Sequence, residues 1–434
     1  MYFSKYNIFS RIRNSENYYL VNILSGSADI LDAEQASDYQ NGNLKNLDEY
    51  IEKGYYTDEK EESQVFKNKY LEFLDEREKE EVQIFFVPSY ACNFACTYCY
   101  QDEYSNENKP LTKEIIDTFF SYIQIEFANR NKYITLFGGE PLLNGKNHKE
   151  NIDYFLEKSK EHNIPIAIVT NGYHLLDYLE SIKNSLIKEI QLTLDGTEKT
   201  HNSRRFLKDH TSTFNEVVNA VDALLESEIN VNLRVVVDKD NISDLPELAK
   251  FAINRGWAKS NFFKTQLGRN YELHHCQVEN SRLFTRIGLY ESLFDLIEKF
   301  PEITEFHKPA FSISKFLFES GELPEPLFDS CPACKSEWAF DYTGKIYPCT
   351  ATVGKQNEEI GSFYPNVYKN IDLIDNWEER DVTSIEKCKN CNLQLACGGG
   401  CASVAKNISG EICSPDCRPI KELLELGFSH YFEK

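Results

Sequence analysis

The sequence lacks three features that would place a protein in a class at once. It has no apolar run of the length that a membrane span needs, so we expect no transmembrane helix and no membrane partner. Its first residues, MYFSKYNIFSRIRNSEN, contain neither a continuous apolar core nor a small-residue cleavage site, so we expect no secretory signal. It also has no tandem repeat and no low-complexity segment. These absences predict a cytoplasmic globular protein.

Basic residues are scarce relative to acidic ones. The chain has 47 Lys and Arg against 69 Asp and Glu, which is a formal net charge of −22 at pH 7. Non-specific binding of nucleic acid requires Lys and Arg to neutralise phosphates, so this charge argues against a nucleic-acid partner. The charge is compatible with a basic peptide partner, although many acidic proteins are simply soluble.

Cysteine is the residue that the sequence has in excess, with 13 in 434 residues. Because the cytoplasm keeps thiols reduced, this number indicates metal ligation or catalysis rather than disulfides. The stretch YACNFACTYCY holds Cys92, Cys96 and Cys99 and no fourth cysteine. A structural zinc site needs four ligands close together, whereas three thiolates can hold three irons of a [4Fe–4S] cluster and leave one iron open. The trio therefore predicts a cluster with an open iron.

Hydrophobic periodicity divides the chain into four parts. Residues 1–60 contain two strand-like runs (residues 6–12 and 18–24) and two helical segments (residues 32–39 and 47–53), in an order that suits a winged helix. Residues 61–81 predict a charged bridging helix. Residues 82–310 alternate six apolar runs with amphipathic stretches, which predicts an α/β fold with a parallel sheet in a partial (β/α)6, TIM-like barrel. Residues 311–434 form a cysteine-rich region.

The spacing of the trio is CxxxCxxC, and at these residues the chain resembles the radical S-adenosylmethionine (SAM) enzymes. In that family the open iron binds the amino and carboxylate groups of SAM. The reduced cluster cleaves SAM to a 5′-deoxyadenosyl radical, which abstracts a hydrogen from the substrate. Polar motifs at the ends of successive predicted strands strengthen the resemblance, which covers about 190 residues. It implies a set of SAM-binding residues: Tyr98, Gly138, Gly139, Glu140, Pro141, Asn171, Thr193, Arg205 and Arg234. Arg204 competes with Arg205 for contact with the SAM carboxylate.

Seven cysteines and a glycine near the C-terminus resemble the SPASM domain, which binds two auxiliary [4Fe–4S] clusters in radical SAM enzymes that modify peptides and proteins. The pattern is Cys-x9-Gly-x4-Cys, then Cys-x2-Cys-x5-Cys-x3-Cys, then a last cysteine. The resemblance implies a proximal set of Cys334, Cys349 and Cys401, with Cys331 as possible fourth ligand, and a distal set of Cys388, Cys391, Cys397 and Cys417. If Cys331 does not bind, the proximal cluster has an open iron.

Zinc is the alternative for the C-terminal cysteines, because CxxC pairs also make four-cysteine zinc sites. The radical SAM motifs upstream favour iron–sulfur, for three clusters in all. Cys413 and Cys276 are left over, and we interpret both as incidental thiols.

Two kinds of SPASM enzyme differ at one position. Anaerobic sulfatase maturases, which make formylglycine, carry a general-base Asp directly after the cysteine of the Gly-x4-Cys segment. That residue is Thr350 here, which cannot accept a proton at neutral pH. Asp341 is near in sequence, but its position is not the family's.

The second kind matures ribosomally made peptides by forming thioether or carbon–carbon links. Such enzymes often begin with a winged-helix module that binds an extended leader peptide by strand addition, and residues 1–60 resemble it. We therefore expect a peptide maturase that uses SAM, with a precursor peptide and a flavodoxin or ferredoxin as partners. A sulfatase maturase, a peptide epimerase, a DNA-binding winged helix, an N-terminal structural cap and a non-catalytic metal scaffold or redox sensor are the alternatives.

Overall fold

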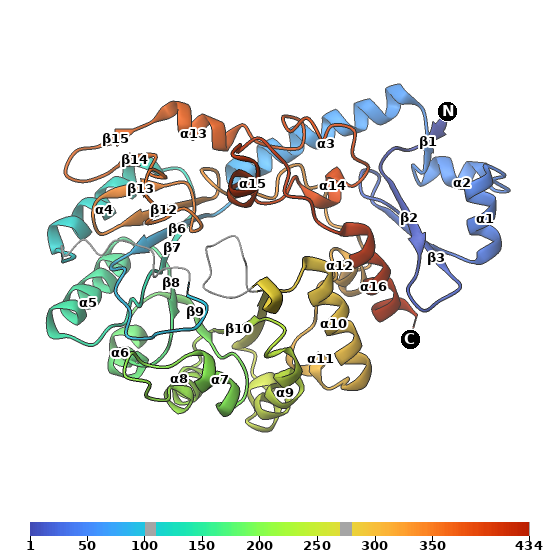
Figure 1. The fold of residues 1–434 in the computed structure, drawn as a ribbon. Helices are drawn as coiled ribbons and strands as arrows, with labels where there is room; N and C mark the ends of the chain where they lie inside the picture. Colours follow the sequence, from blue (N-terminus) through green and yellow to red (C-terminus); the bar gives the residue numbers. More distant parts are fainter. Residues whose placement is uncertain (100–109, 270–279, 434) are drawn as a thin grey trace.

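The computed structural model describes residues 1–99, 110–269 and 280–433. Figure 1 shows a large curved sheet with helices along its outer face, a long helix α3 across the top, and a small N-terminal unit beside the C-terminal helix α16. Within the described residues, no helix combines the length and the apolar character that crossing a bilayer requires. Cys276 lies outside the described residues.

The N-terminal unit is a three-stranded antiparallel sheet with two helices and a two-stranded ribbon. The sheet order is β2–β3–β4, and the ribbon joins β1 to β5. Strand β4 is an element that the sequence analysis did not predict. Helix α1 begins at the N-cap Asp32, whose side chain forms a capping box with Gln35. The elements are β1 (Tyr2–Phe3), β2 (Asn7–Arg11), β3 (Tyr18–Asn22), β4 (Ser27–Leu31), α1 (Ala33–Asn41), α2 (Leu47–Glu52) and β5 (Tyr56–Thr57).

The charged segment after this unit is the single helix α3 (Glu59–Lys79), as the sequence predicts. Its aromatic stripe packs on one residue of the C-terminal region. The rings of Phe66, Tyr70 and Phe73 lie 5.1, 5.2 and 5.4 Å from the ring of Phe328. The helix therefore attaches the N-terminal unit to the cysteine-rich region through apolar contacts, while most of its charged side chains face solvent and Glu62 is buried.

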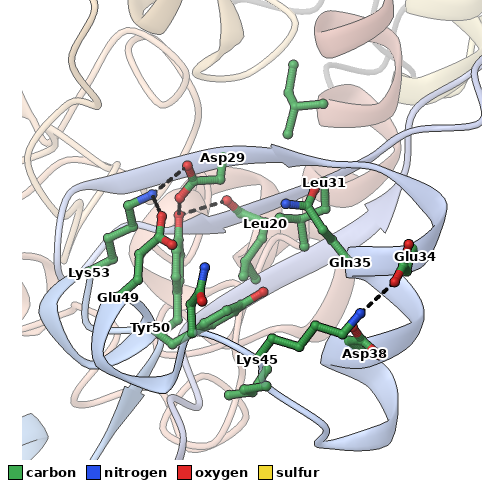
Figure 2. Close-up of a pocket in the computed structure, with 14 residues that line it drawn as sticks. Leu20, Asp29, Leu31, Glu34, Gln35, Asp38, Lys45, Glu49, Tyr50 and Lys53 are labelled. Carbon is green, nitrogen blue, oxygen red and sulfur yellow. Dashed lines mark hydrogen bonds and ion pairs between the residues drawn. The ribbon is translucent and has the colours of Figure 1, made fainter.

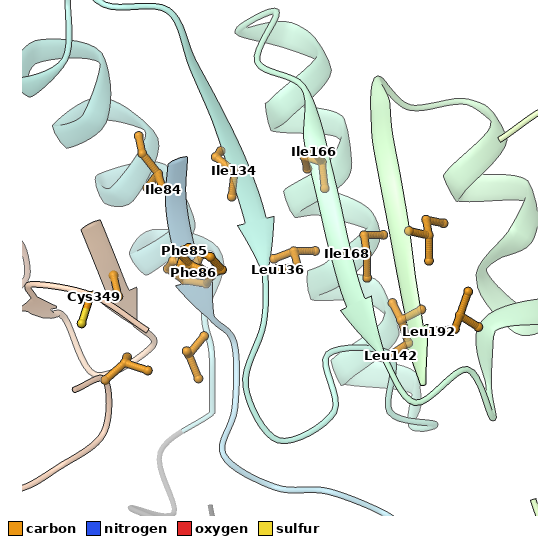
Figure 3. Close-up of a cluster of buried hydrophobic side chains, with 14 of the residues drawn as sticks. Ile84, Phe85, Phe86, Ile134, Leu136, Leu142, Ile166, Ile168, Leu192 and Cys349 are labelled. Atoms are coloured by element: carbon orange, nitrogen blue, oxygen red, sulfur yellow. The ribbon is translucent and has the colours of Figure 1, made fainter. Parts of the chain in front are cut away.

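All six strands predicted for residues 82–310 are present, and they pair in parallel in the order β11–β10–β9–β8–β7–β6. Alternating side chains of these strands meet the helices in a continuous apolar core, part of which is drawn in Figure 3. The partial α/β barrel is thereby confirmed. Its elements are β6 (Val82–Val87), α4 (Lys113–Glu126), β7 (Lys132–Leu136), α5 (Lys146–Glu161), β8 (Ile166–Thr170), α6 (Leu175–Lys183), β9 (Ile187–Thr193), α7 (Glu198–Arg204), α8 (Phe214–Glu226), β10 (Val231–Val237), α9 (Leu245–Asn254) and β11 (Phe263–Arg269).

The cysteine-rich region continues the barrel sheet. Strand β12 pairs in parallel with β6, in a register that sets Trp338 beside Ile84, and β13, β14 and β15 follow in antiparallel order. This pairing joins segments about 250 residues apart and brings Cys349 to the open side of the barrel. The elements are α10 (Arg286–Lys299), α11 (Ile303–Phe306), α12 (Ser314–Ser320), β12 (Glu337–Asp341), β13 (Lys345–Tyr347), β14 (Gly361–Ser362), β15 (Tyr368–Lys369), α13 (Ile371–Glu378), α14 (Gln394–Cys397), α15 (Ala402–Ser409) and α16 (Ile420–Phe432).

Candidate active site

The loop after β6 brings Cys92, Cys96 and Cys99 together at the carboxyl end of the parallel strands. Burial, together with the negative charges of Glu140, Cys96 and Cys99, raises the pKa of the Cys92 thiol to about 12. The three thiols thus lie close enough to feel one another's charge. Such a trio fits a cationic iron centre, since iron binding removes the thiol protons that burial otherwise retains.

Main-chain hydrogen bonds fix this loop against the segment that follows α7. The Ala95 N–H donates to the Phe206 carbonyl over 2.8 Å, and the Thr97 N–H donates to the Arg204 carbonyl over 3.0 Å. These bonds span more than 100 residues of sequence, so the position of the trio depends on the assembled barrel.

The glycines after β7 allow the β7 loop to touch the cysteine loop. A Cβ atom at Gly139 would lie 2.2 Å from the Ala91 carbonyl oxygen and 2.5 Å from that of Tyr90, distances that exclude any side chain. Gly138 adopts a φ of 141° and would place a Cβ 2.7 Å from Val87 Cγ1. The Gly-Gly pair therefore has a steric role inside the protein in addition to the predicted contact with SAM. Pro141 is buried directly after it.

Glu140 is buried and ties the ends of β7 and β8 together. Its Oε1 accepts hydrogen bonds from Thr170 Oγ1 (2.6 Å) and the Leu142 N–H (2.8 Å), and its Oε2 accepts one from the Asn171 N–H (2.6 Å). Burial raises the pKa of Glu140, although the hydrogen bonds oppose that shift. Because all three donors are protein groups, the Glu140 carboxylate holds the segments after β7 and β8 in position at the site.

Tyr98 joins the two candidate arginines. Its hydroxyl donates to Asp195 over 2.5 Å and accepts from Arg205 Nη1 over 2.8 Å. Arg204 instead forms buried ion pairs with Asp195 (3.2 Å) and Asp238 (2.8 Å). The structure thus separates the two neighbours: Arg204 neutralises buried acids, and Arg205 lies beside the cysteine loop. The Asp195 carboxylate, two residues beyond the end of β9, is a positioning group that the sequence analysis did not identify.

Unsatisfied polar atoms surround the cysteine trio. Arg205 Nε, Asn93 Nδ2 and Thr97 Oγ1 are buried without a hydrogen-bond partner among the described residues. Buried donors of this kind are rare in folded proteins unless something else satisfies them. A cofactor with an anionic group, such as the SAM carboxylate, fits a buried guanidinium in this state, so the residues present fit the predicted cluster and SAM.

Two adjoining cavities open from this point. The first, of about 540 Å³, occupies the interior of the curved sheet and is lined by Tyr98, Thr193, Arg234 and Thr350, among others. The second, of about 730 Å³, shares Arg234 with the first and extends to Cys401 and to Ile23 of the N-terminal unit. Asn171 is not among the lining residues of either cavity; its side chain donates to Asn93 (2.8 Å).

The C-terminal cysteines fall into two groups, and the thiols within each group interact electrostatically with one another. Burial raises the pKa of Cys349 well above its usual range, and the charges of Glu337, Cys331 and Cys401 add to the shift. The charge of Cys331 also contributes to the raised pKa of Cys334. The structure thus brings the predicted proximal set together, Cys331 included.

The second group surrounds Cys388. Burial, together with the charges of Cys397, Cys391 and Cys417, raises the pKa of Cys388 to about 11. Cys413 is exposed and lies 3.6 Å from the Ser384 hydroxyl. The predicted distal set is therefore brought together without Cys413, while its role as cluster ligand stays a prediction.

In the described part of the chain, no three His, Cys, Asp or Glu side chains converge closely enough to hold one metal ion. No disulfide joins the cysteines of these residues.

Thr350 is hydrogen-bonded to a buried carboxylate. Its N–H and its hydroxyl donate to the same oxygen of the buried Glu337 carboxylate, over 2.7 and 2.9 Å. A carboxylate thus lies behind the position where sulfatase maturases carry an aspartate. Asp341 accepts instead from Tyr90 (2.9 Å) and Tyr347 (3.1 Å), which makes it part of a buried hydrogen-bond network between the cysteine loop and the β12–β13 hairpin.

The Radical SAM superfamily profile matches residues 86–252, the segment that contains the cysteine trio and the glycine pair. Residues 86–252 therefore form a radical SAM domain. Among curated proteins, the chain is 26% identical to a cysteine-type anaerobic sulfatase-maturating enzyme of Clostridium novyi (strain NT). The 334 aligned residues cover 71% of the chain and 84% of the relative. It is also 26% identical to the GTP 3′,8-cyclase of Campylobacter fetus, over 59% of the chain and 76% of that relative.

Solved structures share its fold. The sulfatase-maturating enzyme anSMEcpe with bound AdoMet and the Cp18Cys peptide has a TM-score of 0.63 at 19% identity, covering 82% of this chain and 99% of that one. Streptococcus suis SuiB bound to its precursor peptide SuiA has a TM-score of 0.54 at 17% identity, covering 96% and 99%. The fold of SuiB therefore accounts for a larger share of this chain than the fold of anSMEcpe.

Proposed function

We propose that this radical SAM enzyme matures a ribosomally made peptide by linking two of its side chains through a thioether or carbon–carbon bond. The observation that carries the proposal is the continuity of the two cavities. The larger one borders Ile23 of the N-terminal unit and Cys401 of the cysteine-rich region, and it shares Arg234, Gln266 and Arg269 with the cavity inside the barrel. A chain held at the N-terminal unit has a path into the barrel.

The comparisons support a peptide or protein as the substrate class. Two of the structures that share the fold, anSMEcpe and SuiB, were solved with peptides bound. SuiB, whose bound partner is a precursor peptide, covers 96% of this chain, against 82% for anSMEcpe. This wider coverage favours a precursor peptide over a folded sulfatase.

The chain's own residues provide the setting for the reaction. When bound, a [4Fe–4S] cluster and SAM supply a 5′-deoxyadenosyl radical that takes a hydrogen atom from the substrate. Cys92, Cys96 and Cys99 would hold that cluster, and Arg205 Nε, buried and unsatisfied, would pair with the SAM carboxylate. Glu140 keeps the strand ends in place around them through its three hydrogen bonds.

The proximal and distal cysteine sets would hold two auxiliary clusters. We propose that they carry electrons between the barrel and a flavodoxin or ferredoxin, because Cys417 is exposed and Cys401 lines the larger cavity. The ligands must stay reduced, so we place the reaction in the cytoplasm.

A sulfatase maturase is the second candidate, and one observation favours it. The Glu337 carboxylate accepts both hydrogen bonds of Thr350, so an acidic group is present near the family's general-base position, although it is not directly exposed to the barrel cavity. The 334 residues that align with the Clostridium novyi enzyme are compatible with this alternative.

The test is an anaerobic incubation of the enzyme with SAM, a reductant and a short peptide encoded beside it, with a sulfatase-derived cysteine peptide in a parallel reaction. Loss of hydrogens in pairs from the first peptide, at a site placed by fragmentation, is the expected result. Conversion of only the second peptide to formylglycine would establish the alternative. Deoxyadenosine formation with solvent deuterium uptake and no mass loss would indicate epimerisation.

A further inference from the structure

The N-terminal sheet has one open edge. Strand β2, at one edge, lies against helix α16: Ser10 Oγ donates to Glu425 over 2.5 Å, and the ring of Tyr19 on the adjacent strand stacks on Phe428 at 4.9 Å. Strand β4, at the other edge, pairs only with β3 among the described residues. An unpaired edge presents a row of backbone donors and acceptors that an extended peptide can bind.

This open edge borders a cleft of about 300 Å³ between β4 and helices α1 and α2, shown in Figure 2. The floor of the cleft is apolar. Leu20, Leu31 and Tyr55 are buried there in a small cluster of their own, against which Tyr50 packs. Side chains alternate along a strand, so Asp29 and Leu31 of β4 face the same side as this floor.

The rim of the cleft is acidic. Lys45 bonds to Glu34 (2.5 Å) and Asp38 (3.1 Å). Lys53 bonds to Asp29 (2.9 Å) and to Glu49 (2.8 Å) on the other side of the cleft. Four carboxylates thus share two ammonium groups, so among the described residues the rim beside the open edge has two negative charges in excess (Figure 2).

We propose that the leader peptide binds along β4 and presents a lysine or arginine to this rim, two positions from an aliphatic or aromatic residue that fills the floor. This inference rests on the proposed function. It adds which side chains of the leader peptide the N-terminal unit recognises. Residues two apart on an added strand face the same side, so a cation opposite Asp29 and an apolar side chain opposite Leu31 meet the rim and the floor together.

A second copy of this chain does not suit the cleft. Pairing two β4 edges would bring two acidic rims together, and like charges across strands are destabilising. A cationic peptide instead gains from the rim charge, and its attraction is screened by salt.

The test is a selection of random dodecapeptides on the full-length protein, with the double variant Asp38→Asn/Glu49→Gln as counter-target. We expect the peptides that bind only the native protein to carry Lys or Arg two positions from an apolar residue. Fluorescence anisotropy should then show about tenfold weaker binding to the double variant, and weaker binding in 0.5 M than in 0.05 M salt. Glu161→Gln, which removes a comparable exposed acid paired with Lys158, should leave affinity unchanged.

Recovery of neutral or acidic peptides, equal binding by the double variant, or no specific peptide at all would overturn the inference. The proposed function is judged separately. A chain that crosslinks its peptide but ignores the rim substitutions refutes only the leader chemistry. A chain that binds cationic strands but modifies no peptide refutes the proposed function and leaves the cleft assignment intact.

Discussion

Replacing Glu140 with glutamine tests whether this residue organises the site or only contacts SAM. In the native protein both carboxylate oxygens are used: Oε1 accepts from Thr170 and Leu142, and Oε2 accepts from Asn171. Glutamine keeps one oxygen for the first two donors. Its NH₂ group then faces the Asn171 N–H, so two donors meet where one hydrogen bond existed.

The magnitude follows from two opposing effects. A hydrogen bond to a charged acceptor contributes about 1.5–3 kcal/mol, and the donor that is left without a partner adds a desolvation cost. Glutamine avoids the cost of burying a carboxylate, which is the cost that raises the pKa of Glu140. Because three donors converge on the side chain, we expect the loss to dominate and the free energy of unfolding to fall by about 2 kcal/mol.

The assay is anaerobic urea unfolding followed by circular dichroism, alongside SAM binding by equilibrium dialysis. The variant's midpoint should fall by roughly 0.5–1 M urea. Glu157→Gln, an exposed acid on α5 with no such contacts, is the matched control and should stay within about 0.5 kcal/mol of the native protein. An unchanged midpoint combined with weaker SAM binding would refute the reasoning, because it would mean that the carboxylate acts on SAM and not on the fold.

Three further substitutions test other parts of the account. Cys92→Ala should remove about one third of the bound iron and abolish deoxyadenosine formation, while Cys413→Ala should change neither; iron analysis and chromatography decide this. Burial, aided by the charge of Arg205, lowers the pKa of His201 to about 3, so the folded state binds fewer protons than the unfolded state, and stability is lost as pH falls through about 6.5. Between pH 7.5 and 5.5 the native protein should therefore lose about 1 kcal/mol more than His201→Gln, and equal losses would contradict the burial argument. Tyr90→Phe removes a hydrogen bond to Asp341 and should cost about 1 kcal/mol, against no measurable cost for Tyr368→Phe on the surface.

Local patterns were sufficient to predict the repetitive parts of this protein. Each strand of the barrel is a short apolar run, and the helices between them show apolar residues at helical spacing, so periodicity located all six strands. The bridging helix was predicted in the same way. Strand β4 was not predicted, because the run before it ended at residue 24 and its own sequence, SADIL, is too polar to read as an apolar run.

Local patterns were insufficient wherever distant segments meet. The pairing of β12 with β6 joins residues 250 apart, and neither strand's own sequence names its partner. The separate roles of Arg204 and Arg205 depend on which guanidinium reaches Asp195 and Asp238, and adjacent arginines look alike in sequence. Thr350 suggested that a carboxylate was missing, and only the fold placed Glu337 behind it.

The sequence by itself predicted the class of reaction. The three cysteines of the trio lie within eight residues, so their spacing, which limits what the loop can bind, can be read directly from the sequence. The tertiary structure decided how the chemistry is positioned and supplied. It brought the C-terminal cysteines into two groups, joined the barrel cavity to the N-terminal unit, and left the acidic cleft beside an open strand edge. These features depend on distances between remote residues, and only packing sets such distances.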